Sequence, residues 1–306
     1  TRLYASNGNA CDVSIPEIIR FYGDDEKTKV VVLYVEGVRE PREFMEAVKE
    51  VARKKPVLAM KAGRTKEGAK AAASHTGGLA KEDVVTDLIF DKAGILSFRD
   101  ESELCEAAAA FVFQPIPKGN RVGVLTNTGG PAVIATDVLV SEGLTIPELS
   151  ERAKEVLKTK LFAEVSIHNP LDILATATGP QFRAALDVMM DEEEIDIIYI
   201  NFVTPFFVDT DAIAREIAEV SRQQRKPIIC NLMTDRRHWT ETVRILKEGG
   251  VPCYAFPGKA ARALAALTRY AGIRSRETGR VKNFPDVIHH EGIEVLRKSN
   301  GRANSM

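Results

Sequence analysis

A histidine followed closely by two glycines is the first group in this sequence that could do covalent chemistry. His75 lies in Ser74-His75-Thr76-Gly77-Gly78, and the run Lys61-Ala62-Gly63-Arg64 precedes it in the chain. A neutral imidazole is a competent nucleophile near pH 7, and lysine and arginine bind anions. The functional interpretation is a mobile histidine that attacks a phosphoryl or acyl group, with Lys61 and Arg64 as anion ligands. The alternative is a surface-loop histidine beside ordinary charges, and spacing alone leaves both open.

A glycine pair marks a second place where an anion could bind. The residues Asn127, Thr128, Gly129 and Gly130 lie between a predicted strand and a predicted helix, and Pro131 follows. Free N–H groups and the positive end of a helix dipole favour phosphate at such a position. A tight turn that needs positive φ would also explain the glycines. Because a flavodoxin-type loop reads T-x-T-G as well, FMN is a rival ligand.

Two carboxylates complete the candidate groups. Glu36 follows the strong strand pattern of residues 29–35, where it could orient an imidazole or stabilise its cation. The alternative is an exposed carboxylate at a strand end. Asp172 closes Asn169-Pro170-Leu171-Asp172, a turn that we expect near the second site. The other histidines have no metal-binding partners at suitable spacing, so we expect no metal site.

Short β-branched runs alternate with helical patterns, which is typical of βαβ units with a parallel sheet. The segment that carries His75 lies just beyond the carboxyl end of a strand, where open α/β sheets place their sites. The expected strands are 29–35, 56–61, 95–98, 121–126, 195–203, 227–233 and 252–256. The expected helices are 41–54, 81–93, 101–113, 131–142, 211–223, 239–247 and 258–271.

A proline-flanked linker at 115–120 divides this pattern into two α/β domains, 1–117 and 118–273. The remaining residues, 274–306, are basic, and we expect a tail or linker with one short helix near 290–298. We assign no function to this tail.

Composition excludes several classes of function. The 306 residues carry 42 Lys+Arg and 43 Asp+Glu, a net charge of −1 that lacks the attraction on which nucleic-acid binders depend. No apolar run approaches the roughly 20 residues that span a bilayer, and no signal peptide is visible, so we expect no membrane association. The four cysteines are scattered and form no C-x-x-C pair, which indicates a reducing compartment and a cytoplasmic location.

Taken in chain order, these motifs resemble those of the NDP-forming acyl-CoA synthetases, the acid–CoA ligases related to succinyl-CoA synthetase. The segments that carry the resemblance are Ser6–Val13, Leu33–Gly37, Lys55–Arg64, Ser74–Ala80, Thr126–Pro131, Asn169–Asp172 and Gly250–Pro252. The resemblance implies two consecutive flavodoxin-like domains with mainly parallel sheets and three α/β/α layers. It covers only the central two-domain region of such an enzyme.

The resemblance also implies a mechanism and roles for the residues. Acyl-CoA and phosphate give an acyl phosphate, its phosphoryl group passes to a histidine, and the phosphohistidine phosphorylates ADP or GDP. His75 matches the phosphorylated histidine, Glu36 matches the carboxylate that holds its imidazole, and Asn127–Gly130 match one of two helix N-termini that stabilise the phosphohistidine. Lys61, Arg64, Ser74, Gly77 and Asp172 are expected to support this site.

The family resemblance further implies partners. A CoA-binding domain and an ATP-grasp domain or subunit supply the CoA and nucleotide sites, and neither is expected within this chain. The chain also starts after the strand and turn that form the other helix N-terminus, so we expect the first domain to lack one βα unit. CoA and Mg-nucleotide would be substrates of the complete enzyme, no tightly bound cofactor is expected, and we expect an oligomer.

Two alternatives to this ligase function stay open. Relatives of the fold serve as acyl-CoA-responsive regulatory or interaction modules without catalysis. A flavodoxin-like electron carrier is the other alternative. We expect the chain alone to be incapable of a full catalytic cycle.

Overall fold

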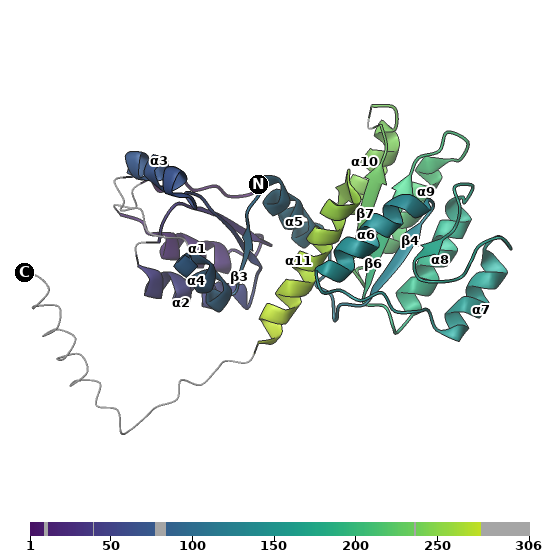
Figure 1. Ribbon diagram of the computed structural model, residues 1–306, viewed down its shortest axis with the longest axis horizontal. Coiled ribbons are helices and arrows are strands. Elements are labelled where there is room, and N and C mark those ends of the chain that lie inside the picture. The colour runs from purple at the N-terminus through teal and green to yellow at the C-terminus, as the bar shows by residue number, and fades with distance from the viewer. Residues whose placement is uncertain (9–11, 39, 77–83, 236, 277–306) are drawn as a thin grey trace, which may run out of the picture. The chain divides into compact units, whose positions relative to one another are not determined.

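The computed structural model describes residues 1–8, 12–38, 40–76, 84–235 and 237–276, with the side chains of 72–76 and 84–85 left out of the description. Residues Thr1–Ser275 form one compact unit, and Arg276–Met306 lie outside it. Two parallel β-sheets with helices between their strands organise the compact unit (Figure 1). This confirms the predicted α/β class with parallel sheets.

The first sheet has three parallel strands in the order β1–β2–β3, which span Val31–Val35, Val57–Lys61 and Ile95–Phe98. One face of it is covered by three helices, α1 (Ile15–Asp24), α2 (Pro41–Ala52) and α4 (Val84–Ala93). Phe44 of α2 and Phe90 of α4 lie in this core with their ring centroids 6.2 Å apart. Apolar residues at helical spacing and β-branched strand residues together bury this face.

The opposite face of the first sheet is covered over β2 and β3 by α5 (Glu101–Phe113). Leu58, Leu96 and Phe98 of the strands lie in one core cluster with Leu104 and Phe111 of α5. On β1 the alternate residues Val32 and Tyr34 are 44% and 61% exposed. Within the described residues, the three-layer arrangement is therefore complete over two strands of this sheet.

The second sheet has five parallel strands in the order β5–β4–β6–β7–β8. They are β4 (Val122–Thr126), β5 (Leu171–Asp172), β6 (Ile197–Val203), β7 (Ile228–Met233) and β8 (Cys253–Tyr254). Its central strands are apolar and buried almost throughout, as strands covered on both faces must be.

Helices cover both faces of the second sheet, in agreement with the predicted three layers. Along β6, Ile197 and Tyr199 point to one core cluster and Ile198, Ile200 and Phe202 to the other. The first face packs on α6 (Gly129–Ser141) and α11 (Pro257–Ser275), which lie in front of the strands in Figure 1. The helices associated with the second face are α7 (Glu151–Lys160), α8 (Gly179–Asp191), α9 (Thr210–Arg222) and α10 (Thr240–Glu248).

Several elements differ from the sequence-based prediction. The helix predicted to start at Pro131 begins at Gly129, and the strand predicted over 252–256 is only Cys253–Tyr254. The helix predicted to end at 271 runs through Gly272 to Ser275, and its last turn is held because Ile273 packs closely over Gly94. The elements that had not been predicted are α1, α3 (Lys66–Thr76), α7, α8 and β5.

The predicted domain boundary at 117/118 falls within the compact unit Thr1–Ser275 and stays a prediction. The helix predicted near 290–298 lies outside the described residues, as do residues 81–83 at the start of the helix predicted over 81–93. None of the helices in the described part of the chain is long and apolar enough to cross a membrane.

Candidate functional site

The segment after β2 is a tight turn that leads into α3. Gly63 has φ +69°, a left-handed conformation that favours glycine. Thr65 then starts the helix, because its hydroxyl accepts a hydrogen bond from the Gly68 N–H at 3.0 Å. A Cβ on Gly68 would come within 3.3 Å of the Gly63 Cα, so both glycines allow the helix to begin directly at the carboxyl edge of the first sheet.

Ser74 and His75 lie in the last turn of α3, not in the loop predicted from their neighbouring glycines. The physical reason is the run Ala71–Ala73, because alanine has the highest helix propensity and extends the helix up to Thr76. The side chains of Ser74 and His75, and all of Gly77, lie outside the described residues. The roles of these three residues stay predictions.

Arg64 is engaged by a carboxylate. Its guanidinium donates two hydrogen bonds to Asp87 of α4, both at 3.0 Å, and a third to the Ser97 hydroxyl at 3.3 Å. These hydrogen bonds hold the pKa of the Asp87 carboxyl below its ordinary value. Arg64 therefore fastens the turn after β2 to α4 and β3, and an anion would compete with Asp87 for it. Asp87 is not among the residues predicted from the sequence.

Glu36 and Lys61 lie at the carboxyl edge of the first sheet on neighbouring strands. Val35, directly before Glu36, is the register partner of Lys61, and the Ala62 N–H donates to the Val35 carbonyl at 2.9 Å. Both charged side chains are half-buried, and the Lys61 ammonium donates to the Ala62 carbonyl. The structure thus brings Glu36, Lys61 and Arg64 to one edge, from which α3 departs.

The other candidate group lies at the carboxyl edge of the second sheet, where β4 passes into α6. Thr128 is the N-cap residue, in extended conformation, and its side chain makes no capping hydrogen bond. Gly129 and Gly130 form the first helical positions and are exposed. The first N–H groups of a helix have no partner inside the helix, so this end of α6 presents donors to solvent.

The backbone does not require the two glycines. Neither Gly129 nor Gly130 is among the glycines with positive φ. A Cβ on Gly130 would meet nothing within 4 Å, and one on Gly129 would only touch Asp172 at an ordinary 3.4 Å. This removes the explanation by a turn of positive φ and favours the one in which the glycines leave room for a ligand close to the backbone.

Asn127 has a different role from the predicted one. Its side chain is 1% exposed, and both of its polar atoms bond to Val203 at the end of β6, with the amide donating to the carbonyl and the oxygen accepting from the N–H, each at 3.0 Å. The amide that we predicted to bind phosphate is therefore used to hold the turn on the neighbouring strand. The backbone N–H groups of the exposed Gly129 and Gly130 are the donors that this turn offers to an anion.

Asp172 is brought next to this turn by β5. It is the register partner of Thr126, and its carboxylate accepts a hydrogen bond from the Leu174 N–H at 3.0 Å. Leu174 itself has φ +71°, which is unfavourable for a branched side chain and marks this corner as tightly constrained. The residues predicted as a turn, Asn169–Asp172, include this short strand, and the Asn169 amide bonds to the backbone of β4 at Val122 and Val124, each at 2.8 Å.

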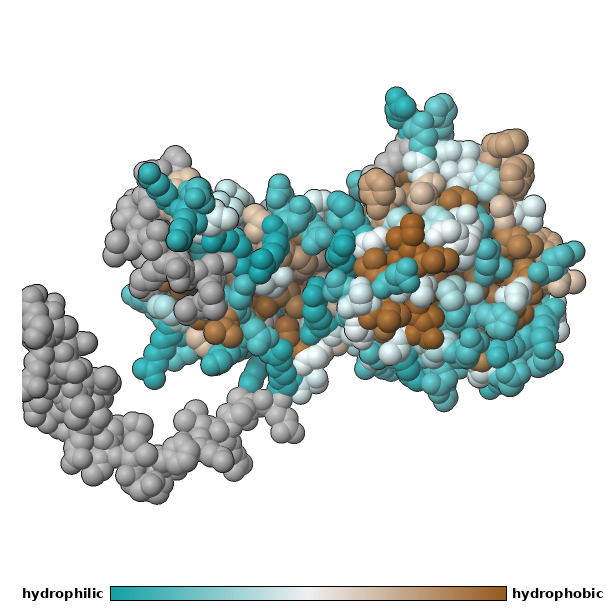
Figure 2. Space-filling model, viewed as in Figure 1, coloured by the Kyte–Doolittle hydropathy of each residue, from teal (hydrophilic) through white to brown (hydrophobic). Residues whose placement is uncertain are grey.

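The outer face of α6 is apolar. Val133, Ile134 and Val140 are each more than half exposed, and Figure 2 shows hydrophobic side chains gathered over this helix. Asp137, also exposed, lies among these residues, and such a group of apolar side chains is typical of a place where another protein surface binds.

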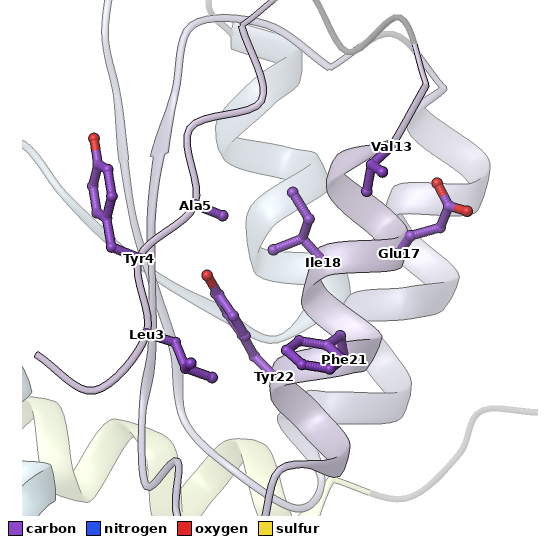
Figure 3. A pocket seen from close by; sticks show the side chains of 8 residues that line it. All are labelled: Leu3, Tyr4, Ala5, Val13, Glu17, Ile18, Phe21 and Tyr22. Carbon is purple, nitrogen blue, oxygen red and sulfur yellow. The ribbon is translucent and has the colours of Figure 1, made fainter.

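An apolar hollow of about 390 Å³ lies elsewhere, between the first residues of the chain and α1. Tyr22 reaches towards it while Tyr4 turns away (Figure 3). Its acidic residue, Glu17, is bonded to Ser14 in the capping box that starts α1, and these bonds lower the pKa of its carboxyl. The hollow contains none of the predicted site residues. In the described part of the chain, no group of three or more His, Cys, Asp or Glu could hold a metal ion.

Comparison with known proteins shows which ones this chain is similar to. Residues 1–111 match the model of the succinyl-CoA ligase-like flavodoxin domain. The chain is 33% identical to the alpha subunit of ADP-forming acetate–CoA ligase II from Pyrococcus furiosus over 275 residues, 88% of this chain and 59% of the relative. Over most of its length the chain is thus similar to NDP-forming acyl-CoA synthetases, and its first part matches their succinyl-CoA ligase-like domain. This confirms the resemblance seen in the sequence.

Two further similar proteins, one of them a solved structure, are named for different acids. The dinucleotide-forming acetyl-coenzyme A synthetase 1 of Ca. Korarchaeum cryptofilum, solved with phosphate and ADP, superposes with a TM-score of 0.82 at 28% identity, over 89% of this chain and 59% of that one. An ADP-forming 4-hydroxybutyrate–CoA ligase from Nitrosopumilus maritimus is 29% identical over 95% of this chain and 45% of its own length. The chain thus spans about three fifths of the length of the Pyrococcus and Korarchaeum proteins and less than half of the Nitrosopumilus ligase.

Proposed function

We propose that this chain is the phosphohistidine-bearing part of an NDP-forming acid–CoA ligase. The complete protein would interconvert acyl-CoA, phosphate and NDP with the free acid, CoA and NTP, through an acyl phosphate and phospho-His75. Glu36 would hold the imidazole, and the N-terminus of α6 would receive the phosphoryl group. Kinship with ADP-forming acetate–CoA ligases over most of the chain supports this function.

The observation that carries the proposal is the start of α6. Gly129 and Gly130 are exposed at the first two helical positions, whose N–H groups have no partner inside the helix, and neither conformation nor packing demands glycine there. A helix N-terminus stabilises a phosphoryl group through these N–H groups and through its dipole, and this stabilisation needs no charged side chain. Since phosphoryl transfer depends chiefly on positioning and charge stabilisation, such an end suits the proposed chemistry.

Each residue then has a defined part in the transfer. The unprotonated nitrogen of His75 attacks the phosphorus of the acyl phosphate, the P–O bond to the acyl group breaks, and the carboxylate of the acid leaves. Glu36 accepts the hydrogen bond from the other ring nitrogen and stabilises the positive charge that develops on the imidazole. The phosphoryl group later leaves the same nitrogen for the terminal phosphate oxygen of NDP.

The proposed partners follow from the part of the family that this chain spans. A CoA-binding domain and a nucleotide-binding domain or subunit of the ATP-grasp type would complete the enzyme, in an oligomer located in the cytoplasm. The exposed apolar face of α6, beside the proposed phosphoryl site, supports contact with such a partner. CoA and Mg-nucleotide would enter as substrates. The family includes acetate and 4-hydroxybutyrate ligases, so the acyl group stays open.

Labelling tests the proposal directly. The complete protein, incubated with ATP labelled at the γ-phosphate, should take up label that is released by acid and retained in base, as expected for phosphohistidine. His75→Asn should abolish this label, whereas the matched variant His168→Asn, in an exposed loop of the second half, should keep it. Undiminished label in His75→Asn would refute the proposal. Acyl-CoA binding without any labelling would favour a regulatory module of the same fold.

A further inference from the structure

Polar residues occupy one register position across all five strands of the second sheet. Asp172, Thr126, Asn201, Asn231 and Tyr254 are successive register partners from β5 to β8. Asn201 and Asn231 are fully buried, in strands that are otherwise almost wholly apolar. Because burying an amide costs free energy unless it is hydrogen-bonded, the contacts of these two side chains indicate what each is used for.

Asn201 bonds to the turn that starts α6. Its amide donates to the Thr126 hydroxyl at 3.1 Å and to the Thr128 carbonyl at 3.4 Å. The Thr126 hydroxyl in turn donates to the Thr128 carbonyl at 2.6 Å and accepts from the Thr128 N–H at 3.0 Å. The N–H and the carbonyl of Thr128, the N-cap residue, are therefore both hydrogen-bonded by buried side chains of the sheet.

This arrangement replaces an ordinary N-cap. In most helices the N-cap side chain folds over the first turn and bonds to its N–H groups, which blocks them for a ligand. Here the Thr128 side chain makes no such bond, and the turn is fixed from the sheet side instead. The first turn of α6 can keep a single conformation while the N–H groups of Gly129 and Gly130 remain available.

We propose that Asn201 is a positioning residue for the phosphoryl site, which it holds open and ordered through Thr126 and Thr128. The inference rests on the proposed function and deepens it, because it assigns the ordering of the anion-binding turn to a side chain on another strand. Asn201 itself touches no substrate. Without Asn201, the first turn of α6 would have to become ordered each time an anion binds, and this loss of conformational entropy would weaken binding.

Asn231 offers a matched control. It lies one strand away at the same register position, is equally buried, and like Asn201 has a side-chain oxygen without a hydrogen-bond partner among the described residues. Its amide donates to the Tyr254 carbonyl at 3.0 Å, not to the turn of α6. Replacing either asparagine should lower stability, but only replacing Asn201 should weaken anion binding.

The test uses the 306-residue chain labelled with ¹⁵N and titrated with inorganic phosphate, with the amide signals of Gly129 and Gly130 as the readout. In the unaltered protein these signals should shift and saturate. Asn201→Leu should raise the phosphate dissociation constant about fivefold, the size of a helix-terminus contribution of about 1 kcal/mol. Asn231→Leu should leave it within about twofold, although both variants unfold at lower temperature.

A second pair covers the case in which Asn201→Leu does not fold. Thr126→Val removes the same network with a side chain of equal shape. Thr210→Val removes a buried hydroxyl that bonds to the Thr242 hydroxyl of α10, away from the turn of α6. Thr126→Val should weaken phosphate binding and Thr210→Val should not. Equal effects within each pair would overturn the inference and leave the proposed function standing. No phosphate response at Gly129 and Gly130 in the unaltered chain would overturn the inference as well, and the labelling of His75 would then decide the function separately.

Discussion

At the scale of single residues, the charged groups of the first sheet divide into those that hold the structure and those left for chemistry. The Arg64 guanidinium donates hydrogen bonds to Asp87 and Ser97, so its main contribution is to fix the turn between β2 and α3. Glu36 is half-buried at the adjacent strand end. A carboxylate in that place can stabilise an imidazolium, which makes Glu36 the residue whose removal should change the reaction most selectively.

We expect Glu36→Gln in the complete protein to slow phosphorylation of His75 about tenfold or more. Glutamine keeps the shape of the side chain but loses the charge, whose interaction with a cation at about 4 Å is worth roughly 1 to 4 kcal/mol near a protein surface. Rapid-quench measurement of labelled phosphohistidine gives the rate, and Glu46→Gln on the exposed side of α2 is the control. Equal rates for both variants would contradict the role of Glu36.

A second residue-scale prediction concerns acid stability. The Asp196 side chain is 10% exposed. Its carboxylate accepts hydrogen bonds from the Arg121 guanidinium at 2.9 and 3.0 Å and from the backbone N–H of Arg121 at 3.2 Å. These bonds lower the pKa of Asp196 in the folded protein. A carboxyl group with a lowered pKa contributes stability that is present above its unfolded pKa of about 3.9 and is lost as the pH falls through the folded value.

Asp196→Asn should therefore cost about 1.5 to 3 kcal/mol of unfolding free energy at pH 7, the range for hydrogen bonds to charged groups. The difference between the two proteins should shrink as the pH drops below about 4, where Asp196 becomes protonated in the unfolded chain, and should vanish below its lower pKa in the folded chain. Urea unfolding at pH 7, 5 and 3 measures this. A difference that stays constant across the three pH values would show that the charge of Asp196 is not the cause.

At the scale of elements, the helix starts explain what could and could not be predicted. The apolar runs of β1, β4, β6 and β7 were predicted within two residues at each end because buried parallel strands are continuous hydrophobic segments. The missed helices α1 and α8 do carry a start signal, Ser14-x-x-Glu17 and Thr178-x-x-Gln181, and both form capping boxes. Asn201 also stands out in the sequence as a polar residue inside the apolar run of β6. Its contact with the turn of α6 depends on the order of the strands, which cannot be predicted from one sequence.

The element-scale prediction concerns the first turn of α6. Gly130→Ala should stabilise the protein by about 0.5 kcal/mol, since alanine fits a helical position that is open to solvent and restricts the unfolded chain. The same methyl group should weaken phosphate binding if the glycine leaves room for the anion. Urea unfolding and phosphate titration of one variant measure both effects. A stabilised variant with unchanged phosphate affinity would show that the ligand does not approach Gly130.

At the scale of the whole molecule, α5 and α11 pack into a core cluster that reaches both sheets. One core cluster contains Leu58 and Leu96 of the first sheet as well as Val122 and Ile197 of the second. Phe111 of α5 and Tyr270 of α11 meet edge to face, with centroids 5.6 Å apart. We therefore expect the two sheets to unfold together, because a linker between independently folding domains has few such contacts.

Gln114, directly after α5, provides the sharpest test of this shared core. It is 5% exposed; its amide donates to the Gly250 carbonyl at 2.7 Å and the Ser221 hydroxyl at 3.1 Å, and its oxygen accepts from the Ile228 N–H at 2.7 Å. Gln114→Leu would leave buried backbone groups unpaired at about 1 to 3 kcal/mol each.

We expect Gln114→Leu to lower the urea midpoint equally in two signals, the fluorescence of the single tryptophan, Trp239 at the start of α10, and the far-UV circular dichroism of all helices. The exposed Gln223→Leu is the control and should move neither. Coincident transitions follow if the sheets unfold together, because a two-state unit gives the same midpoint with every probe. Two results would contradict this: a second unfolding transition seen by circular dichroism but not by Trp239 fluorescence, or a lowered urea midpoint in the fluorescence alone. Either would mean that the first sheet unfolds on its own and that the cluster around α5 and α11 does not couple the two halves.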